Sequence, residues 1–178
     1  IKTTLFEKSQ ETQEHAERIA ELMKEVGVKL SLSPVEIYEL EMLSMLHDIG
    51  KIGIDDRVLK KPDKLTDNEW KEMRKHPEIG YRIAMSSPDI ASTAEFILCH
   101  HEHWDGSGYP KGLKGEDIPL LSRILAVVDA YDAMTQNRIY REAMPKKAAI
   151  EEIKRNSGKQ FDPNIVNIFV NEVLSGRG

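Results

Sequence analysis

Apolar residues return at helical spacing along the first part of the chain. Between Thr4 and Val26 they fall three or four positions apart, as they do on one face of an α-helix. These apolar positions are Ala16, Ile19, Ala20, Met23 and Val26. Gly27 follows the last of them and is a common helix terminator. The pattern therefore predicts a helix over residues 4–26 that packs one face on a core.

The segment after Ser33 predicts a second helix. Ser33 suits the N-cap, Pro34 suits the first helical position, and Glu36 can return a hydrogen bond to the cap. The apolar residues that follow are too continuous for a surface helix. They are Leu40, Met42, Leu43, Met45 and Leu46. We therefore expect this helix to be buried at the centre of the fold.

Capping residues and prolines predict the remaining helices. Thr66 and Glu69 form a second capping box, and their helix should run to His76, where Pro77 marks a boundary. Later helix starts are predicted at Ser87–Pro88, Pro119, Pro145 and Pro163, with Gly158 as a stop. No segment alternates with a period of two over the length of a strand. We predict an all-α bundle of about seven or eight helices, in a single domain over residues 1–178.

Composition and charge narrow the function classes. The 178 residues include 25 basic and 30 acidic ones, which gives a net charge of −5, and the basic residues are scattered. Duplex nucleic acid requires a basic surface, so we do not expect that partner. No run of about 18 apolar residues occurs, and the first residues lack the pattern of a secretory signal. These features predict a cytoplasmic domain without a membrane segment.

Six histidines lie within the first 103 residues: His15, His47, His76, His100, His101 and His103. His47 is followed by Asp48 at the end of the second predicted helix. Burial of this pair is costly unless something compensates both groups, and a divalent cation does so. Taken alone, the dipeptide is explained better by a plain helix end, with His47 favoured by the helix dipole and Gly50 as the stop.

Other histidines and carboxylates stand where they could share a metal. Glu11 and His15 are four positions apart, so both side chains project from one face of the first helix. His100 and His101 diverge by about 100° on an ideal helix, so they share an ion only near a helix end or else point toward different ions. Asp129 lies in an apolar run, where a metal would explain a lone carboxylate.

The motifs HDIGK, HHEHWDGSGYP, VVDAYDAM and FDP occur in this order and resemble those of the HD-GYP family. This family is the bacterial branch of the HD metal-dependent phosphohydrolases that hydrolyses cyclic di-GMP. The resemblance runs from about Glu11 to Val173 and implies a helical HD domain with a metal centre in its core. It places metal ligands on His15, His47, Asp48, His76, His100, His101 and Asp129. A glutamate that members of the three-metal type carry falls on Glu11.

The chemistry of this ligand set suits hydrolysis of a phosphodiester. Two ions can supply an activated hydroxide and relieve charge on the phosphoryl oxygens, and Asp48 could bridge them with its two oxygens. Imidazoles mixed with carboxylates favour two or three ions of iron or manganese over magnesium or structural zinc. We expect His47 and Asp48 to be catalytic. Asp132 is left open between support for a ligand and an ordinary helix charge.

Three basic side chains are candidates for substrate contact. Lys51, four residues after His47, should face the same cavity and act in catalysis by holding a phosphate oxygen or assisting the leaving group. Its alternative is an ordinary partner of the helix dipole. The resemblance places substrate-binding roles on Arg138 and Arg141. Ile139 stands where the family commonly has a proline, so we expect a looser turn there.

The resemblance implies a role in bacterial signal transduction, by hydrolysis of cyclic di-GMP to linear pGpG and in some members to GMP. Two alternatives stay open: a degenerate HD module that binds without hydrolysing, and a hydrolase of another cyclic dinucleotide. The segment Trp104–Pro110 is expected to contact a diguanylate cyclase (GGDEF) domain. The chain begins in mid-helix, so we expect it to be the C-terminal output part of a protein with an upstream sensory domain. The first helix could also form a homodimer through Leu5, Ile19 and Val26.

Overall fold

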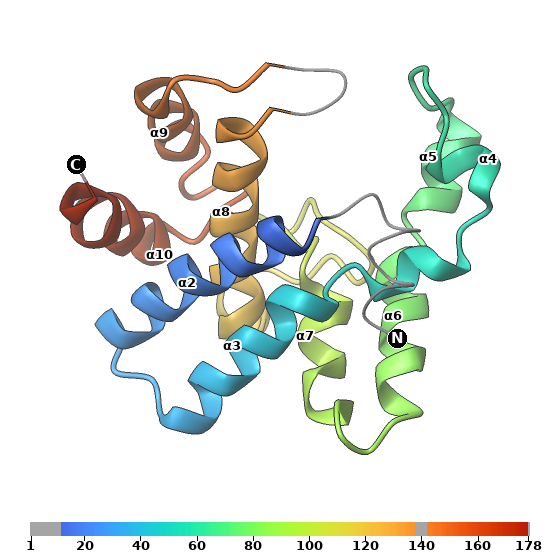
Figure 1. The fold of residues 1–178 in the computed structure, drawn as a ribbon, viewed down its shortest axis with the longest axis horizontal. Helices are drawn as coiled ribbons and strands as arrows, with labels where there is room; N and C mark the ends of the chain where they lie inside the picture. Colours follow the sequence, from blue (N-terminus) through green and yellow to red (C-terminus); the bar gives the residue numbers. More distant parts are fainter. Residues whose placement is uncertain (1–11, 138–141, 178) are drawn as a thin grey trace.

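Three helices form the centre of the molecule. The computed structural model describes residues 12–137 and 142–177, and every regular element within these ranges is a helix (Figure 1). The all-α prediction is confirmed. The helices α2 (Gln13–Lys29), α3 (Pro34–Leu46) and α8 (Leu120–Thr135) pack against one another. Their apolar faces supply fully buried side chains such as Ile19, Leu40 and Ile124, and this contact is the core on which the other helices assemble.

The remaining elements surround or extend this centre. The chain continues after α3 with η1 (Ile49–Gly53), α4 (Asp56–Leu59), α5 (Asp67–Met73), α6 (His76–Met85), η2 (Ala91–Thr93), α7 (Ala94–Cys99) and η3 (Gly115–Asp117). After α8 come α9 (Lys146–Arg155), α10 (Pro163–Ile168), the π-helical turn η4 (Phe169–Val173) and η5 (Leu174–Gly176). The pair α6 and α7 packs together beside α3, whereas α9 and α10 cover α8 from the opposite side (Figure 1).

The two predicted capping boxes are present. The Ser33 hydroxyl accepts a hydrogen bond from the Glu36 amide at 3.3 Å, and the Glu36 carboxylate accepts one from the Ser33 amide at 2.8 Å. Thr66 and Glu69 make the same reciprocal pair at the start of α5. Each box supplies acceptors for amides that have no partner within their own helix, so the starts of α3 and α5 follow from local sequence.

Two predicted helices differ from the structure, one in where it ends and the other in how deeply it is buried. The described part of α2 begins at Gln13 and runs past Gly27 to Lys29, because the carbonyl oxygens of Val26 and Gly27 accept from amides further along. The chain then reverses at Ser31, whose φ is 56°. On α3, Leu40 and Leu43 are buried, but Met42 and Met45 remain half-buried, so this helix is less enclosed than predicted.

The helix end predicted at His76 and the helix start predicted at Ser87 are both displaced. The first helix of this region, α5, ends at Met73, and His76 begins α6 with Pro77 in its first turn. Proline fits there because the amides of a first helical turn have no intrahelical acceptor. The Ser87 amide donates to the carbonyl of Ala84, so Ser87 closes α6 instead of opening the next helix. As a result α7 begins only at Ala94, after the short turn η2.

The segment of α4 and α5 projects from the bundle (Figure 1). Lys61 and Glu69 join its two halves by an ion pair of 2.6 Å. Within residues 12–137 and 142–177, no helix combines the length and apolarity needed to cross a membrane.

Candidate metal centre

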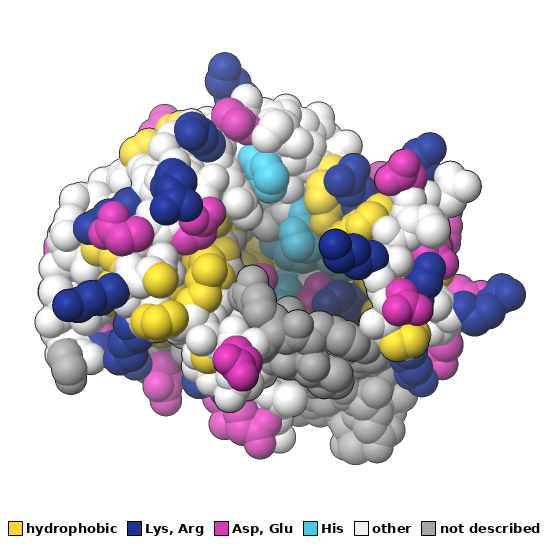
Figure 2. Space-filling view, turned by 90° about the horizontal axis from the view of Figure 1, so that it is seen from above, with side chains coloured by type: hydrophobic (Ala, Val, Ile, Leu, Met, Phe, Trp, Pro, Cys, Tyr) yellow, Lys and Arg dark blue, Asp and Glu magenta, His cyan; other side chains and the backbone are white. Residues whose placement is uncertain are grey.

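Buried imidazoles converge where several helices end. His47 and His100 are the C-cap residues of α3 and α7, and His76 is the first residue of α6. All three are at most 4% exposed. His15 lies in the first turn of α2 and is 5% exposed. Figure 2 shows histidine side chains inside a hollow of the surface, with Lys and Arg side chains beside it. A buried imidazole requires a partner for each ring nitrogen, so these rings must be satisfied within the hollow.

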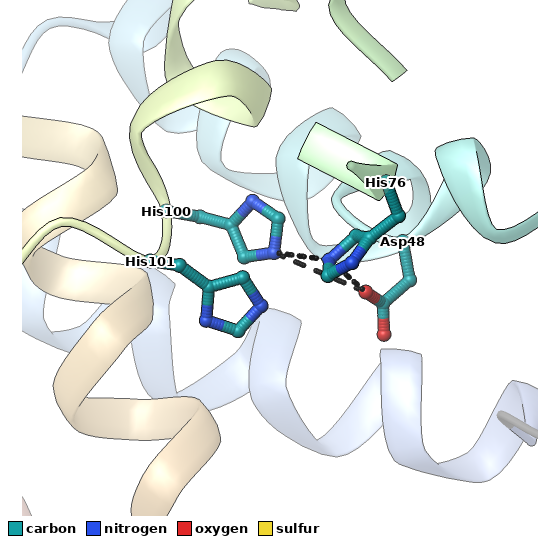
Figure 3. Close-up of side chains that lie close together, drawn as sticks. All are labelled: Asp48, His76, His100 and His101. Atoms are coloured by element: carbon teal, nitrogen blue, oxygen red, sulfur yellow. Dashed lines mark hydrogen bonds and ion pairs between the residues drawn. The ribbon is translucent and has the colours of Figure 1, made fainter. Parts of the chain in front are cut away.

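One group consists of Asp48, His76, His100 and His101, each with a ligand atom within 4.8 Å of those of the others (Figure 3). The Nε2 atom of His76 lies 3.3 Å from Asp48 Oδ1 and 3.3 Å from His100 Nε2. His100 and His101 both reach this group because the helix ends at Cys99, so the second ring is released from helical geometry. The two rings therefore lie in one group at a helix end, and a shared ion remains a prediction.

The ring nitrogens of His76 and His100 show that this group can hold a cation. Nδ1 of His76 lies 2.8 Å from the Met73 carbonyl oxygen, and Nδ1 of His100 lies 2.6 Å from that of Ile97. A carbonyl oxygen only accepts, so each Nδ1 carries hydrogen and each neutral ring has its lone pair on Nε2. Burial lowers the pKa of His100 to about 3, so that ring is neutral at pH 7. The two Nε2 atoms lie 3.3 Å apart, and in the neutral rings a divalent ion between them would accept both lone pairs.

A second group consists of His15, His47 and Asp129, whose ligand atoms again lie within 4.8 Å of one another. His15 Nε2 is 3.3 Å from Asp129 Oδ1. His47 Nδ1 lies 3.0 Å from the Ser44 carbonyl oxygen, so its Nε2 is also the nitrogen available to a metal. The three residues come from α2, α3 and α8, which are the helices of the central contact.

Asp48 belongs to the first group and also contacts the second. Its Oδ1 lies 3.3 Å from His76 Nε2 in the first group, and its Oδ2 lies 3.4 Å from His47 Nε2 in the second. Lys51 Nζ is 2.7 Å from the same Oδ2. Burial alone would raise the pKa of Asp48, but Lys51, His47 and His76 together lower it well below the ordinary value. The carboxylate is therefore ionised and can offer one oxygen to each of two ions.

The structure brings together most of the residues that the sequence singled out. His15, His47, Asp48, Lys51, His76, His100, His101 and Asp129 all belong to, or directly contact, the two groups. Glu11, Arg138 and Arg141 lie outside the described residues. His103 belongs to neither group, and its Nδ1 lies 3.1 Å from Ser107 Oγ. Sequence reasoning left the role of Asp132 open and missed Arg18. Asp132 Oδ2 lies 2.6 Å from His15 Nδ1, and a terminal nitrogen of Arg18 donates to the same oxygen at 2.9 Å. The spacing of three residues between His15 and Arg18 was the available signal.

The loop after His101 folds back on the first group. The Tyr109 ring stacks on His101 with centroids 5.0 Å apart, and the Arg74 guanidinium lies 5.3 Å from the Tyr109 centroid. Buried Glu102 holds the loop by accepting hydrogen bonds from two of its backbone amides. Gly108 allows the close approach, because a Cβ there would lie 2.3 Å from the His103 amide nitrogen. The GYP segment thus covers a candidate ligand, which the sequence did not reveal.

Comparison with known proteins identifies the family. A sequence model described as an HD domain matches residues 1–165. The chain belongs to the HD domain family. The resemblance drawn from the motifs is confirmed as well, because this model matches most of the chain and two relatives 44% identical to it are named cyclic di-GMP phosphodiesterases.

Curated relatives of this HD domain chain carry phosphodiesterase names. A cyclic di-GMP phosphodiesterase of Thermotoga maritima is 44% identical over 162 residues, which are 90% of this chain and 44% of the relative. The cyclic di-GMP phosphodiesterase response regulator RpfG of Xanthomonas campestris is 44% identical over 86% of this chain and 41% of its own length. A 3'3'-cGAMP-specific phosphodiesterase 2 of Vibrio cholerae is 36% identical over 92% of this chain and 32% of its own length. The chain thus spans less than half the length of these relatives.

Two solved structures share the fold of this HD domain chain. A cyclic GMP-AMP specific phosphodiesterase of Vibrio cholerae, V-cGAP3, superposes with a TM-score of 0.76 at 24% identity, over 99% of this chain and 48% of that chain. The HD-GYP-type protein Bd1817 of Bdellovibrio bacteriovorus gives a TM-score of 0.69 at 22% identity, over 91% of this chain and 52% of that chain. At these identities the likeness establishes the helical architecture alone.

Proposed function

We propose that this HD domain chain is a metal-dependent phosphodiesterase that hydrolyses cyclic di-GMP to linear pGpG, with onward hydrolysis to GMP as a second step. The observation that carries the proposal is Asp48, an ionised carboxylate that belongs to one buried histidine group and contacts the other. A site with two adjacent ions suits phosphodiester hydrolysis, and two relatives 44% identical to this chain are named cyclic di-GMP phosphodiesterases.

The proposed site residues divide by role. We assign two or three ions of iron or manganese to the ligands His15, His47, Asp48, His76, His100, His101 and Asp129, with Glu11 as ligand to a third ion. The mixture of imidazole and carboxylate donors supports these metals, because magnesium prefers shells made of oxygen and structural zinc closes at four ligands. We assign substrate contacts to Lys51, Arg138 and Arg141.

The chain's own residues orient the substrate and balance its charge. When bound, a pair of divalent ions supplies an activated water and neutralises charge on the phosphate. His47 and Asp48, which we propose as catalytic, would hold the ions, because Asp48 contacts one histidine of each group. Lys51 Nζ lies 2.7 Å from Asp48 Oδ2, so its positive charge adjoins the place where a phosphate oxygen would bind. Lys51 therefore stabilises the developing negative charge of the reacting phosphate.

A second candidate substrate is 3'3'-cGAMP. Two relatives, 36% and 35% identical to this chain, are named 3'3'-cGAMP-specific phosphodiesterases. Both dinucleotides present the same bridging phosphates and differ in one base, so the histidine groups do not discriminate between them. Base contacts decide the preference, and a direct comparison of the two substrates measures it.

The wider biological setting is part of the same proposal. We assign the chain to cytoplasmic signal transduction, as the output part of a longer protein with an upstream sensory domain. The relatives that extend well beyond the matched region support this assignment. The loop Trp104–Pro110 is the proposed contact for a diguanylate cyclase (GGDEF) domain. The homodimer expected through the first helix cannot use Ile19 and Val26, because both are fully buried in the core, and Leu5 lies outside the described residues.

The test is hydrolysis by the purified chain. The protein is incubated under anaerobic, reducing conditions with Fe(II) or Mn(II) and either cyclic di-GMP or 3'3'-cGAMP, and the products are separated by chromatography. We expect metal-dependent formation of pGpG, its loss in His47→Ala and Asp48→Ala, and its retention in His103→Ala, because His103 lies outside both groups. Failure of the metal-loaded chain to cleave either dinucleotide would refute the proposal.

A further inference from the structure

His15 is held differently from the other histidines of the two groups whose Nδ1 contacts are known. Three of them direct Nδ1 to a carbonyl oxygen three residues earlier in the chain: His47 to Ser44, His76 to Met73, and His100 to Ile97. Each of these histidines lies at or just beyond the C-terminal end of a helix. Carbonyl groups in the last turn of a helix have no intrahelical donor, so the backbone itself can orient these rings.

His15 lies instead at the N-terminal end of α2. The carbonyl oxygen three residues before it, on Thr12, already accepts the Ala16 amide at 3.2 Å. The acceptor for His15 Nδ1 comes instead from α8, where Asp132 Oδ2 lies 2.6 Å away. Asp129, one turn earlier on α8, faces the other ring nitrogen at 3.3 Å. One face of α8 therefore contacts both nitrogens of the His15 ring.

A carboxylate in this position needs a cation of its own. The Asp132 side chain is 4% exposed, and burial of an ionised carboxylate is costly without charge compensation and hydrogen bonds. Arg18, one turn after His15 on α2, donates from Nε to Oδ1 at 2.8 Å and from a terminal nitrogen to Oδ2 at 2.9 Å. Such a bidentate contact balances the negative charge of the carboxylate and also fixes the orientation of its plane.

We propose that Arg18 is a positioning residue for the metal site formed by His15, His47 and Asp129. Its guanidinium holds the Asp132 carboxylate in the plane that accepts Nδ1–H of His15, which directs His15 Nε2 toward Asp129. Arg18 and His15 share α2, whereas Asp132 and Asp129 share α8, so the contact also fixes the rotation of one helix against the other. The inference rests on the proposed function only in that the histidine groups bind metal.

This arrangement predicts a site-selective effect. The group of Asp48, His76, His100 and His101 has no member in contact with Arg18 or Asp132 among the described interactions. Removal of Arg18 should therefore lower the metal affinity of the site formed by His15, His47 and Asp129 and leave the affinity of the other site unchanged. Loss of a partner that orients a metal-binding histidine typically reduces metal affinity by about 10–100-fold.

The experiment is a titration of the metal-free chain with Mn(II) alone, in which free Mn(II) is quantified by electron paramagnetic resonance. The variants are Arg18→Met and Arg18→Lys, with Arg177→Met as the matched control, since Arg177 donates to Glu25 on the same helix α2 far from the histidines. We expect at least two sites in the wild type and in Arg177→Met. In Arg18→Met we expect one affinity to fall by about 10–100-fold while the other is unchanged, with partial recovery in Arg18→Lys.

Two results overturn the inference: two unchanged affinities in Arg18→Met, or equal weakening of both sites. A wild-type chain with a single Mn(II) site overturns it as well. If circular dichroism shows that Arg18→Met does not fold, Arg18→Lys decides alone, because it keeps the charge and loses the bidentate contact. A wild-type chain that binds two Mn(II) ions but cleaves no cyclic dinucleotide refutes the proposed function and leaves the role of Arg18 standing.

Discussion

A methyl group at position 50 would collide with the backbone of α6. In the structure, a Cβ on Gly50 would lie 1.8 Å from the His76 carbonyl oxygen and 2.6 Å from the Gly80 amide nitrogen. Real Cβ atoms essentially never come closer than 3.0 Å to another heavy atom, so the His76 oxygen must retreat by at least 3.0 minus 1.8, or 1.2 Å. Backbone atoms cannot rotate aside as side chains can. Gly50→Ala must therefore push η1 and α6 apart.

The displacement acts directly on the candidate metal centre. Asp48 precedes Gly50 by two residues, and its Oδ1 lies 3.3 Å from Nε2 of His76, the residue that Gly50→Ala would displace. Excess volume in a packed contact costs about 1–3 kcal/mol of unfolding free energy. For a chain of this size, about 2–4 °C of melting temperature corresponds to 1 kcal/mol, so we expect a decrease of about 2–12 °C. A shift of about 1 Å in such a constellation can lower activity about 100-fold.

Thermal unfolding of the metal-free chain and Mn(II) titration measure the two effects separately. Gly176→Ala is a neutral control, because no heavy atom lies within 4 Å of its added Cβ. Gly53→Ala is an intermediate control, because its Cβ would lie 2.9 Å from a methyl group of Ile79, which can turn away. We expect melting temperature and Mn(II) affinity to be highest in Gly176→Ala, intermediate in Gly53→Ala and lowest in Gly50→Ala. Wild-type melting and wild-type Mn(II) affinity in Gly50→Ala would show that the backbone contact does not constrain the centre.

Three further predictions concern regions outside the ligand set. Glu102→Ala removes the acceptor of two amides in the loop segment 111–113, so we expect the unfolding free energy in a urea titration to fall by about 1–3 kcal/mol; an unchanged midpoint and slope contradict this. Phe169→Ala empties a fully buried position and should cost about 3–5 kcal/mol in the same assay, and a smaller loss than that of Glu102→Ala counts against it. Hydrogen bonds from Lys61 and from the Thr66 amide lower the pKa of Glu69 from 4.5 to about 2, so the stabilising contribution of the ionised Glu69 is present above pH 4.5 and is lost as the pH falls toward 2. Carboxyl NMR should show this titration midpoint, with a partial return toward 4.5 in Lys61→Met, because the Thr66 amide still donates to Glu69.

Local sequence was sufficient to predict the elements whose ends depend on their own side chains. The capping boxes at Ser33 and Thr66 begin helices as predicted, since each satisfies amides within three residues of itself. The prediction was wrong at Ser87, because its amide completes the end of α6. A serine followed by proline is compatible with the end of one helix and with the start of the next. Only the position of the preceding helix decides between the two. Gly50 shows the same limit, since it is needed for close packing against α6 and not only as a helix stop.

The sequence by itself determined that the fold is helical, which apolar runs form the core, and which histidines and carboxylates could bind a metal. These properties depend on residue type and on spacing within a turn or two, which local hydrogen bonding and burial reflect directly. Only the tertiary structure decided which of these groups meet. Asp48 contacts histidines of two groups drawn from different helices, and Arg18 reaches Asp132 across 114 positions of the chain. Such contacts depend on how helices cross and rotate against one another, which the packing of the whole core sets.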